Sequence, residues 1–349
     1  MPIKLGVPLD QAGLLDVSQL RIAKALSVTT VEELAGILLT AGQRVGPLFE
    51  GADLPQLAAE AMKMASYSVT DDLKRAREAS GDRGTGALPP TESDAERVSE
   101  LFVEDVDLRL GDASDKPEVF LESCLGPVRD QGQRGTCVAH AVVAVLECLE
   151  AHRLGTKIDL SEQFLYWACK MKDRAPHQSG TWQQVAVPLA VESGICKEHI
   201  WPYNPTTIAR NESHGPPPDQ SAAASDASEH MPKQGLIMNG SALDRVMARL
   251  DDGHCLAISV PVYSNWETPT VEHEGHIPMP IPGEVPKGGH AMCVVGYGYS
   301  DDEFTGGGYV IVRNSWGTSW AYRSPFGPGY GTLPFSYVSR YWWELTSLD

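Results

Sequence analysis

One cysteine lies at the predicted start of a helix, a position that favours a reactive thiol more than it favours burial of the side chain. Residues 132–150 read GQRGTCVAHAVVAVLECLE, and a glycine-flanked turn places Cys137 at the start of an amphipathic helix. A helix N-terminus presents unpaired backbone N–H groups and a partial positive charge, which stabilise a thiolate and lower the pKa of the thiol. We therefore predict that Cys137 is a nucleophile near neutral pH.

A nucleophilic thiol needs a base that takes its proton and returns it to a leaving group, and His290 is the best-placed histidine. It follows Gly288 and Gly289, which let the backbone approach closely, and it opens an apolar run that is typical of a strand. Asn314 ends the next such run, where its side-chain carbonyl can accept the imidazole N–H and fix the tautomer. These residues predict a catalytic triad.

Acyl transfer also needs hydrogen-bond donors for the negative charge that develops on the substrate oxygen. Gln131 precedes Cys137 by six residues, across the same turn. Its side-chain amide could donate there, beside the backbone N–H of Cys137. All the groups that acyl transfer requires thus come from three short segments.

The segments DQGQRGTCVAHA, GGHAMCVVGY and VRNSWGTSW together resemble the active-site blocks of papain-like cysteine peptidases. The resemblance covers about residues 117–345. It implies that Cys137 is the nucleophile, His290 the general acid and base, Asn314 the group that orients it, and Gln131 the oxyanion donor. The implied reaction is hydrolysis of peptide bonds in a peptide or protein substrate through a thioester acyl-enzyme, with no metal and no organic cofactor.

The same resemblance suggests where a substrate lies. Trp316 would shield the Asn–His hydrogen bond from water, which keeps that bond strong. Gly180 lies in SGTWQQVAVPLAV, which resembles the family segment that forms a ledge for the substrate backbone. We expect Gly180, Gly289 and Trp316 to border the bound substrate.

Three positions depart from the family pattern. Arg134 replaces the cysteine that precedes the nucleophile by three residues, so the disulfide common in secreted members cannot form there. Val138 replaces the tryptophan after the nucleophile, and Ala321 replaces a glycine. These changes affect the shape of the site rather than its chemistry.

The remaining pattern predicts an α+β protein in which a helical lobe packs against a sheet lobe. The resemblance implies that this is a papain-like two-lobed fold, with an antiparallel sheet or barrel in the second lobe. Residues 1–77 are predicted to form a small helical bundle, with an Asp16 cap and a Thr30–Glu33 capping box. Residues 78–104 are rich in glycine, proline and charge and are predicted to be a flexible linker. Residues 105–349 are predicted to form a papain-like peptidase domain, with a surface insertion loop at about 211–235.

Within that domain the helical signals come first and the strand signals later. One helix is predicted to start at Cys137, and a second to follow Ser161 as its cap. A third is predicted over TWQQVAVPLAVESG and ends at Gly194, and a fourth over SALDRVMARLDDG with Ser241 as its cap. Strands are predicted over CLAISVPVY, HAMCVVGYGY and GYVIVRNSW.

Composition narrows the classes of partner. The formal net charge of −18 disfavours nucleic acid and anionic membrane surfaces. The N-terminal residues lack the pattern of a signal peptide, so we expect a cytoplasmic protein. The seven cysteines are scattered without a C-x-x-C pair, which argues against a disulfide framework or a structural zinc site.

Two other functions fit the same residues. The chain could be a catalytically inactive adaptor that uses the papain fold to bind, or a Cys–His acyl transferase that passes the acyl group to an amine. The long inhibitory pro-segment of secreted family members is not recognisable in residues 1–115. We therefore expect the atypical N-terminal bundle to be a regulatory or targeting domain that persists in the working enzyme and that could bind a protein partner.

Overall fold

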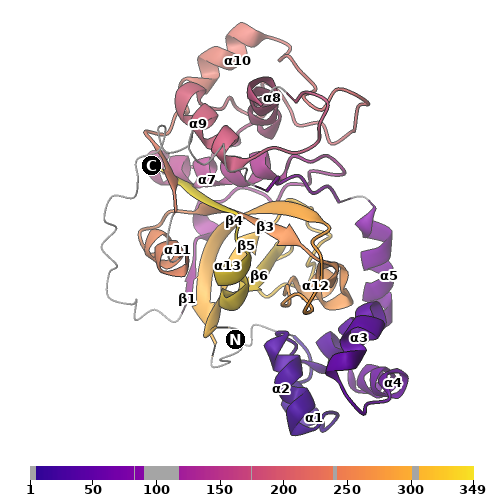
Figure 1. Ribbon diagram of the computed structural model, residues 1–349. Coiled ribbons are helices and arrows are strands. Elements are labelled where there is room, and N and C mark those ends of the chain that lie inside the picture. The colour runs from indigo at the N-terminus through magenta and orange to yellow at the C-terminus, as the bar shows by residue number, and fades with distance from the viewer. Residues whose placement is uncertain (1–4, 82, 90–117, 174, 239–241, 301–305) are drawn as a thin grey trace.

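The computed structural model describes residues 5–81, 83–89, 118–173, 175–238, 242–300 and 306–349. A helical lobe and a sheet lobe pack against each other, and the N-terminal helices lie beside the sheet lobe (Figure 1). Among the described residues, no helix is both long enough and apolar enough to cross a membrane.

The helical lobe is built around one long buried helix. Helix α7 (Cys137–Leu154) is buried on nearly every side because it packs against other helices and against the sheet. Around it lie α8 (Glu162–Lys172), capped by Ser161, and α9 (Gln183–Ser193), which ends at Gly194. These three helices begin or end where the sequence predicted.

The sheet lobe is antiparallel throughout its described strands, in the order β2-β7-β3-β4-β5-β6, with β1 paired to β4. Strands β4 and β5 are neighbours, so His290 on β4 and Asn314 just after β5 come together. The strands are β1 (Glu118–Phe120), β2 (Gly235–Ile237), β3 (Leu256–Val262), β4 (Gly288–Tyr299), β5 (Gly308–Arg313), β6 (Tyr330–Pro334) and β7 (Glu344–Leu348).

Short helices surround this sheet. They are η2 (Glu122–Cys124), α11 (Ala242–Asp251), η3 (Ser264–Glu267), α12 (Pro269–Glu274) and α13 (Phe335–Tyr341). The predicted Ser241 cap of α11 lies outside the described residues.

The N-terminal bundle has its own apolar core. It contains α1 (Leu9–Ala12), α2 (Val17–Ala25), α3 (Val31–Val45), η1 (Gly46–Leu48), α4 (Leu54–Met64) and α5 (Val69–Ser80). Capping boxes at Asp16 and Thr30 start α2 and α3, as predicted. Ile281, which follows α12 in the chain, packs into the same core.

Buried polar contacts fasten this bundle to α12. The Nδ1 atom of His273 lies 2.8 Å from an oxygen of Asp72, and the imidazole stacks on the ring of Tyr67. Arg83 forms a two-point ion pair with Glu272, with distances of 2.6 and 2.9 Å. Bidentate Arg–carboxylate pairs fix geometry as well as adding energy, so α12 holds the chain just before it enters the space between the lobes.

Two predicted loops need correction. The first is the predicted linker 78–104, because α5 continues to Ser80 and residues 83–89 form backbone hydrogen bonds with the rest of the chain. These hydrogen bonds offset the conformational entropy lost when the segment is ordered. Residues 90–104 lie outside the described residues. The predicted insertion loop 211–235 contains α10 (Gln220–Ala227), which Asp219 caps and which buries Ala223 and Ala227.

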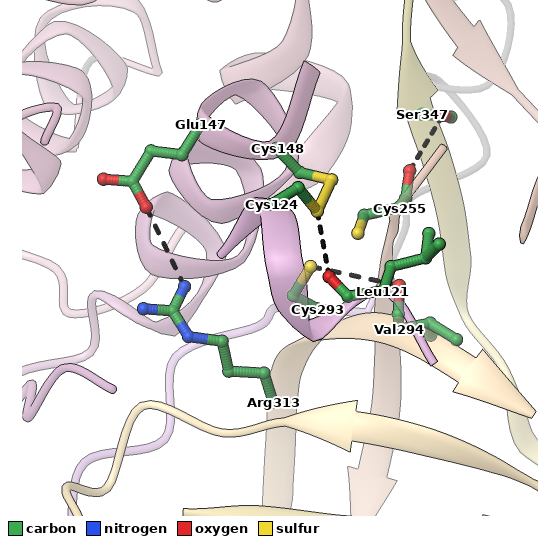
Figure 2. The surroundings of a disulfide bond; sticks show 9 residues. All are labelled: Leu121, Cys124, Glu147, Cys148, Cys255, Cys293, Val294, Arg313 and Ser347. Carbon is green, nitrogen blue, oxygen red and sulfur yellow. Dashed lines mark hydrogen bonds and ion pairs between the residues drawn. A yellow bond between two sulfur atoms is a disulfide. The ribbon is translucent and has the colours of Figure 1, made fainter. Parts of the chain in front are cut away.

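The cysteine prediction also needs correction, because Cys124 and Cys148 form a disulfide (Figure 2). It joins η2 to α7 across 24 residues, a contact that sequence spacing alone does not reveal. Cys255 and Cys293 lie nearby, and a hydrogen bond with the Cys293 thiol, together with burial, raises the pKa of Cys255.

Reduction of this disulfide is expected to lower the free energy of unfolding by about 3 kcal/mol, the chain-entropy value for a loop of this length. Urea unfolding with and without a thiol reductant measures the difference. A variant with both Cys124→Ala and Cys148→Ala is the control, since its midpoint should not respond to reductant. Equal midpoints for the native protein under both conditions would contradict this expectation.

Candidate active site

His290 and Asn314 form a buried hydrogen bond where β4 and β5 lie side by side. The Nε2 atom of His290 is 2.7 Å from Oδ1 of Asn314. Because an amide oxygen only accepts, Nε2 carries the proton, and Nδ1 is the nitrogen left for proton exchange. Nδ1 is buried and has no hydrogen-bond partner among the described residues. The ring of Trp316 covers this pair, with its centroid 4.5 Å from that of His290.

Cys137 begins α7 as predicted, and it is fully buried. The backbone N–H of Ala291, the residue after His290, lies close enough to lower the pKa of the thiol, which places the sulfur beside the histidine. Burial has the larger, opposite effect and raises the pKa of Cys137 to about 11. The expected thiolate near neutral pH is therefore wrong for this closed structure, because removing water outweighs the helix N-terminus.

Gln131 directs its amide at a peptide carbonyl. Its Nε2 donates to the backbone oxygen of Gly84 at 3.0 Å and to that of Arg134 at 2.6 Å. Its Oε1 accepts a hydrogen bond from Ser315 Oγ at 2.6 Å, which fixes the direction of the amide. The Gln131 amide, which the sequence predicted to donate to a substrate oxygen, therefore donates to the peptide oxygen of Gly84 in this structure.

That peptide belongs to a covering segment, residues 83–89, which lies over Cys137. Gly84 donates its N–H to Gly132, and Gly86 and Ala87 both donate to the carbonyl of Gly289. On the side of the helical lobe, Leu88 donates to Thr181 and Thr181 donates to Gly86. The segment therefore bridges both lobes, and burial of Cys137 is the result.

The predicted substrate residues all border the covering segment. A side chain at Gly180 would clash with the Gly86 oxygen, because a Cβ there would lie 2.6 Å from it. Gly289 supplies the carbonyl that accepts two N–H groups, and the Nε1 atom of Trp316 donates to the Gly84 oxygen at 3.0 Å. These three residues contact a peptide backbone in this structure.

Two residues of the site were missed by the sequence reasoning. Thr181, and not Gly180, exchanges the ladder hydrogen bonds with the covering segment. Ser315 orients Gln131, although it stands inside the segment VRNSWGTSW that carried the resemblance. Its position directly after Asn314 was the available signal.

The departures from the family pattern have structural consequences. Arg134 is buried, and its guanidinium donates to Gln163 and to the carbonyls of Asn204 and Glu212, so it ties the turn before Cys137 to the insertion. Ala321 keeps a left-handed backbone with φ of 49°, the conformation that favours glycine at this position.

Residues that could hold a metal lie elsewhere. Among the described residues, two groups bring potential ligand atoms together, namely Cys124, Cys148 and His152, and Asp226, Glu229 and His230. The first contains the disulfide, and in the second Asp226 already pairs with Lys197. Neither includes Cys137 or His290.

The raised pKa of Cys137 predicts slow alkylation of the full-length protein. A thiol with a pKa of about 11 is ionised at pH 7 about 100-fold less than one with the usual value of 9.0, and only thiolate reacts. Mass spectrometry of iodoacetamide-treated protein between pH 6 and 11 should show Cys137 labelling that rises steadily with pH. Protein unfolded in guanidinium is the reference. Rapid labelling of folded protein that is constant above pH 6 would contradict the closed state.

Comparison with known proteins identifies a family that matches this chain. The model for "Papain family cysteine protease" matches residues 115–326. The chain is 25% identical over 218 residues to "Uncharacterized peptidase C1-like protein L477" of Acanthamoeba polyphaga mimivirus, which covers 60% of this chain and 65% of that protein. It is 28% identical over 207 residues to caricain of Carica papaya, covering 56% and 49%. The match thus spans less than two thirds of either relative.

Two solved structures share the fold. Xylellain, a cysteine protease from Xylella fastidiosa, matches with a TM-score of 0.62 and 22% identity, over 77% of this chain and 96% of that one. Digestive procathepsin L 3 of Tenebrio molitor larval midgut matches with a TM-score of 0.55 and 16% identity, over 96% and 99%. The α+β, papain-like architecture is therefore established. On the family match over more than half of its length, this chain belongs to the papain family of cysteine proteases.

Proposed function

We propose that this chain is a cysteine peptidase that its own N-terminal region holds inactive until the covering segment leaves Cys137. The observation that carries the proposal is the convergence of Cys137, the His290–Asn314 pair and the Gln131 amide on one stretch of peptide backbone. A site built only for packing has no need of an oriented amide donor beside a thiol and an imidazole.

The chemistry follows from these positions. Once the covering segment has left, Nδ1 of His290 takes the thiol proton and the Cys137 sulfur attacks the carbonyl carbon of a peptide bond. Asn314 holds the imidazolium through Nε2, while Gln131 and the Cys137 N–H stabilise the oxyanion. His290 returns the proton to the leaving amine, a thioester forms, and water that His290 activates hydrolyses it to release the acid.

The backbone groups that the covering segment presents to Cys137 support an inhibitory role. The backbone N–H groups of Gly86 and Ala87 lie near the sulfur and lower its pKa, so the segment offers the nucleophile amide hydrogens rather than a carbonyl carbon. The Gly84 oxygen occupies Gln131 and Trp316 instead. A peptide held this way blocks the site without being a substrate.

The N-terminal bundle is then the anchor of that segment. Arg83, the first residue of the covering segment, is held by Glu272 on α12, where the bundle also docks through Asp72 and His273. The fold similarity to a solved proenzyme, which spans 96% of this chain, agrees with such an arrangement. A domain that only targets the enzyme would not need to hold a segment over Cys137.

The test of this proposal combines labelling with hydrolysis. An epoxide inhibitor of cysteine peptidases, added after limited proteolysis of the native protein, should label Cys137 and no other free cysteine, and should stop hydrolysis of a mixed peptide library. The free cysteines buried elsewhere, such as Cys169 and Cys196, serve as internal controls. Hydrolysis that continues after complete labelling of Cys137 would overturn the proposal.

The two other functions are distinguished in the same assay. An acyl transferase would give amide products when an amine nucleophile is added, and mass spectrometry detects them beside the hydrolysis products. A non-catalytic adaptor would give neither product, even after the N-terminal region has been removed. We favour the peptidase because the nucleophile, base, orienting amide and oxyanion donor are all retained.

A further inference from the structure

A small cavity is bordered by Asn314, the partner of His290 in the hydrogen bond described above. Its volume is about 10 Å³, and its lining includes His140, Asn314, Arg313 and Arg129. A cavity of that size accommodates a single water molecule. The polar atoms that line it have no role in the chemistry described above.

Three residues that line this cavity each carry a buried polar atom with no hydrogen-bond partner among the described residues: Nε2 of His140, Nδ2 of Asn314 and Nε of Arg313. His140 and Arg313 are each 5% exposed and Asn314 is 3% exposed. Buried polar atoms in native proteins almost always have a partner, either protein or ordered water. Three such atoms on one cavity therefore point to a shared partner.

The chemistry of these atoms identifies that partner. Nδ1 of His140 lies 3.0 Å from the carbonyl of Thr136, so Nδ1 carries the proton and Nε2 is an acceptor. Nδ2 of Asn314 and Nε of Arg313 are donors. One acceptor and two donors complement a water molecule, which can donate to the first and accept from the other two.

We propose that His140 is a positioning residue for the Asn314–His290 pair and that it acts through one water molecule in this cavity. The inference rests on the proposed peptidase function. The water holds the amide of Asn314 with its nitrogen toward the cavity and its oxygen toward His290. If the amide turned over, its NH₂ group would face the protonated Nε2 of His290, and the imidazolium would lose its acceptor.

The surroundings keep His140 in the form that this role requires. The charged and titratable groups that face it are Arg134, Arg313, Arg129, His290 and Tyr203. The ring of Tyr203 packs edge-on against the imidazole, with 4.8 Å between the ring centroids. Burial, opposed by the Thr136 carbonyl and aided by the three arginines, lowers the pKa of His140 to about 3. His140 therefore remains a neutral acceptor throughout the pH range in which a peptidase would work.

The test compares His140→Phe, which removes the acceptor, with His140→Gln, whose side-chain oxygen can still accept from the water. In enzyme whose covering segment has been displaced, we expect His140→Phe to lower kcat by roughly 10- to 100-fold, the effect of losing one buried hydrogen bond to a charged group. KM should change little. Burial lowers the pKa of His290, and the Asn314 hydrogen bond opposes that effect. Weakening this hydrogen bond should therefore lower the pKa further and move the alkaline limb of kcat/KM to lower pH.

His140→Gln should recover most of the rate and the original alkaline limb. Two results would overturn the proposal: a His140→Phe enzyme with native kcat and pH profile, or a His140→Gln enzyme as impaired as His140→Phe at equal melting temperature. The second would indicate packing alone.

A readout that does not depend on activity separates this inference from the peptidase assignment. A high-resolution crystal structure of the native full chain should contain a water within hydrogen-bond distance of His140 Nε2 and Asn314 Nδ2. If that water is present in a protein that hydrolyses nothing, the peptidase proposal fails, but the proposed link between His140 and Asn314 through a water is supported. If the water is absent, the proposed link fails whatever the activity.

Discussion

Replacing Cys137 with alanine is expected to reduce peptide hydrolysis by at least about 10⁴-fold, to the rate of the uncatalysed reaction plus whatever binding and oxyanion stabilisation contribute. The reason is that the other groups act on the sulfur. His290 has no proton to accept and Gln131 no oxyanion to bind when no covalent bond forms. The measurement is kcat/KM on a peptide substrate after the N-terminal region has been displaced.

A matched control is Cys169→Ala, which removes another buried free thiol of the helical lobe. Its activity should stay within a small factor of native, because Cys169 lies on α8 and its thiol hydrogen-bonds to the Thr181 side chain rather than to a catalytic group. A Cys137→Ala enzyme that retains a tenth or more of native kcat/KM would show that the hydrolysis has another nucleophile.

Two substitutions within the covering segment are expected to raise the activity of the full-length protein at least tenfold. A Cβ atom at Gly84 would lie 2.2 Å from the backbone oxygen of Arg134, and one at Gly86 would lie 2.2 Å from that of Gly135. Backbone atoms cannot move aside as a flexible side chain can. The double variant Gly84→Val, Gly86→Val must therefore lift the segment away from Cys137, while every catalytic side chain stays unchanged.

The same variant should also change the chemistry of the thiol. Burial is the main cause of the raised pKa of Cys137, so return of water should lower that pKa and speed alkylation at pH 7. Thr85→Ser is the control, because the exposed Thr85 side chain lies between the two glycines and its shortening leaves the segment in place. If the glycine variant remains as slow and as unreactive as native while Thr85→Ser behaves identically, the segment is not the inhibitor. A native-like melting temperature rules out unfolding as the cause of any increase.

Local signals explain what the sequence predicted well. Helix starts at Asp16, Thr30 and Ser161 depend on hydrogen bonds between residues three positions apart, so they can be identified without knowing the fold. The strands that carry His290 and precede Asn314 were predicted in the same way, from short β-branched runs. Those runs also placed both residues at strand ends, where neighbouring strands could join them.

Composition was a poorer guide to order. Residues 83–89 contain glycine and proline and little apolar surface, which is typical of a linker, but glycine also permits the close backbone approach that the two lobes require. The insertion was predicted to be a loop for the same reason, although its alanines bury against the helical lobe in α10.

The family, several helix starts, the strands that carry His290 and precede Asn314, and the candidate catalytic residues could all be predicted from the sequence, because each of these depends on short spacings along the chain. Only the tertiary structure decided that Cys124 pairs with Cys148, that residues 83–89 lie over Cys137, and that His140 shares a cavity with Asn314. Each of those contacts joins residues far apart in the chain. These contacts form only when the completed helices and strands pack together. The pKa of Cys137 is likewise set by burial of its thiol in the packed structure rather than by its neighbours in the sequence.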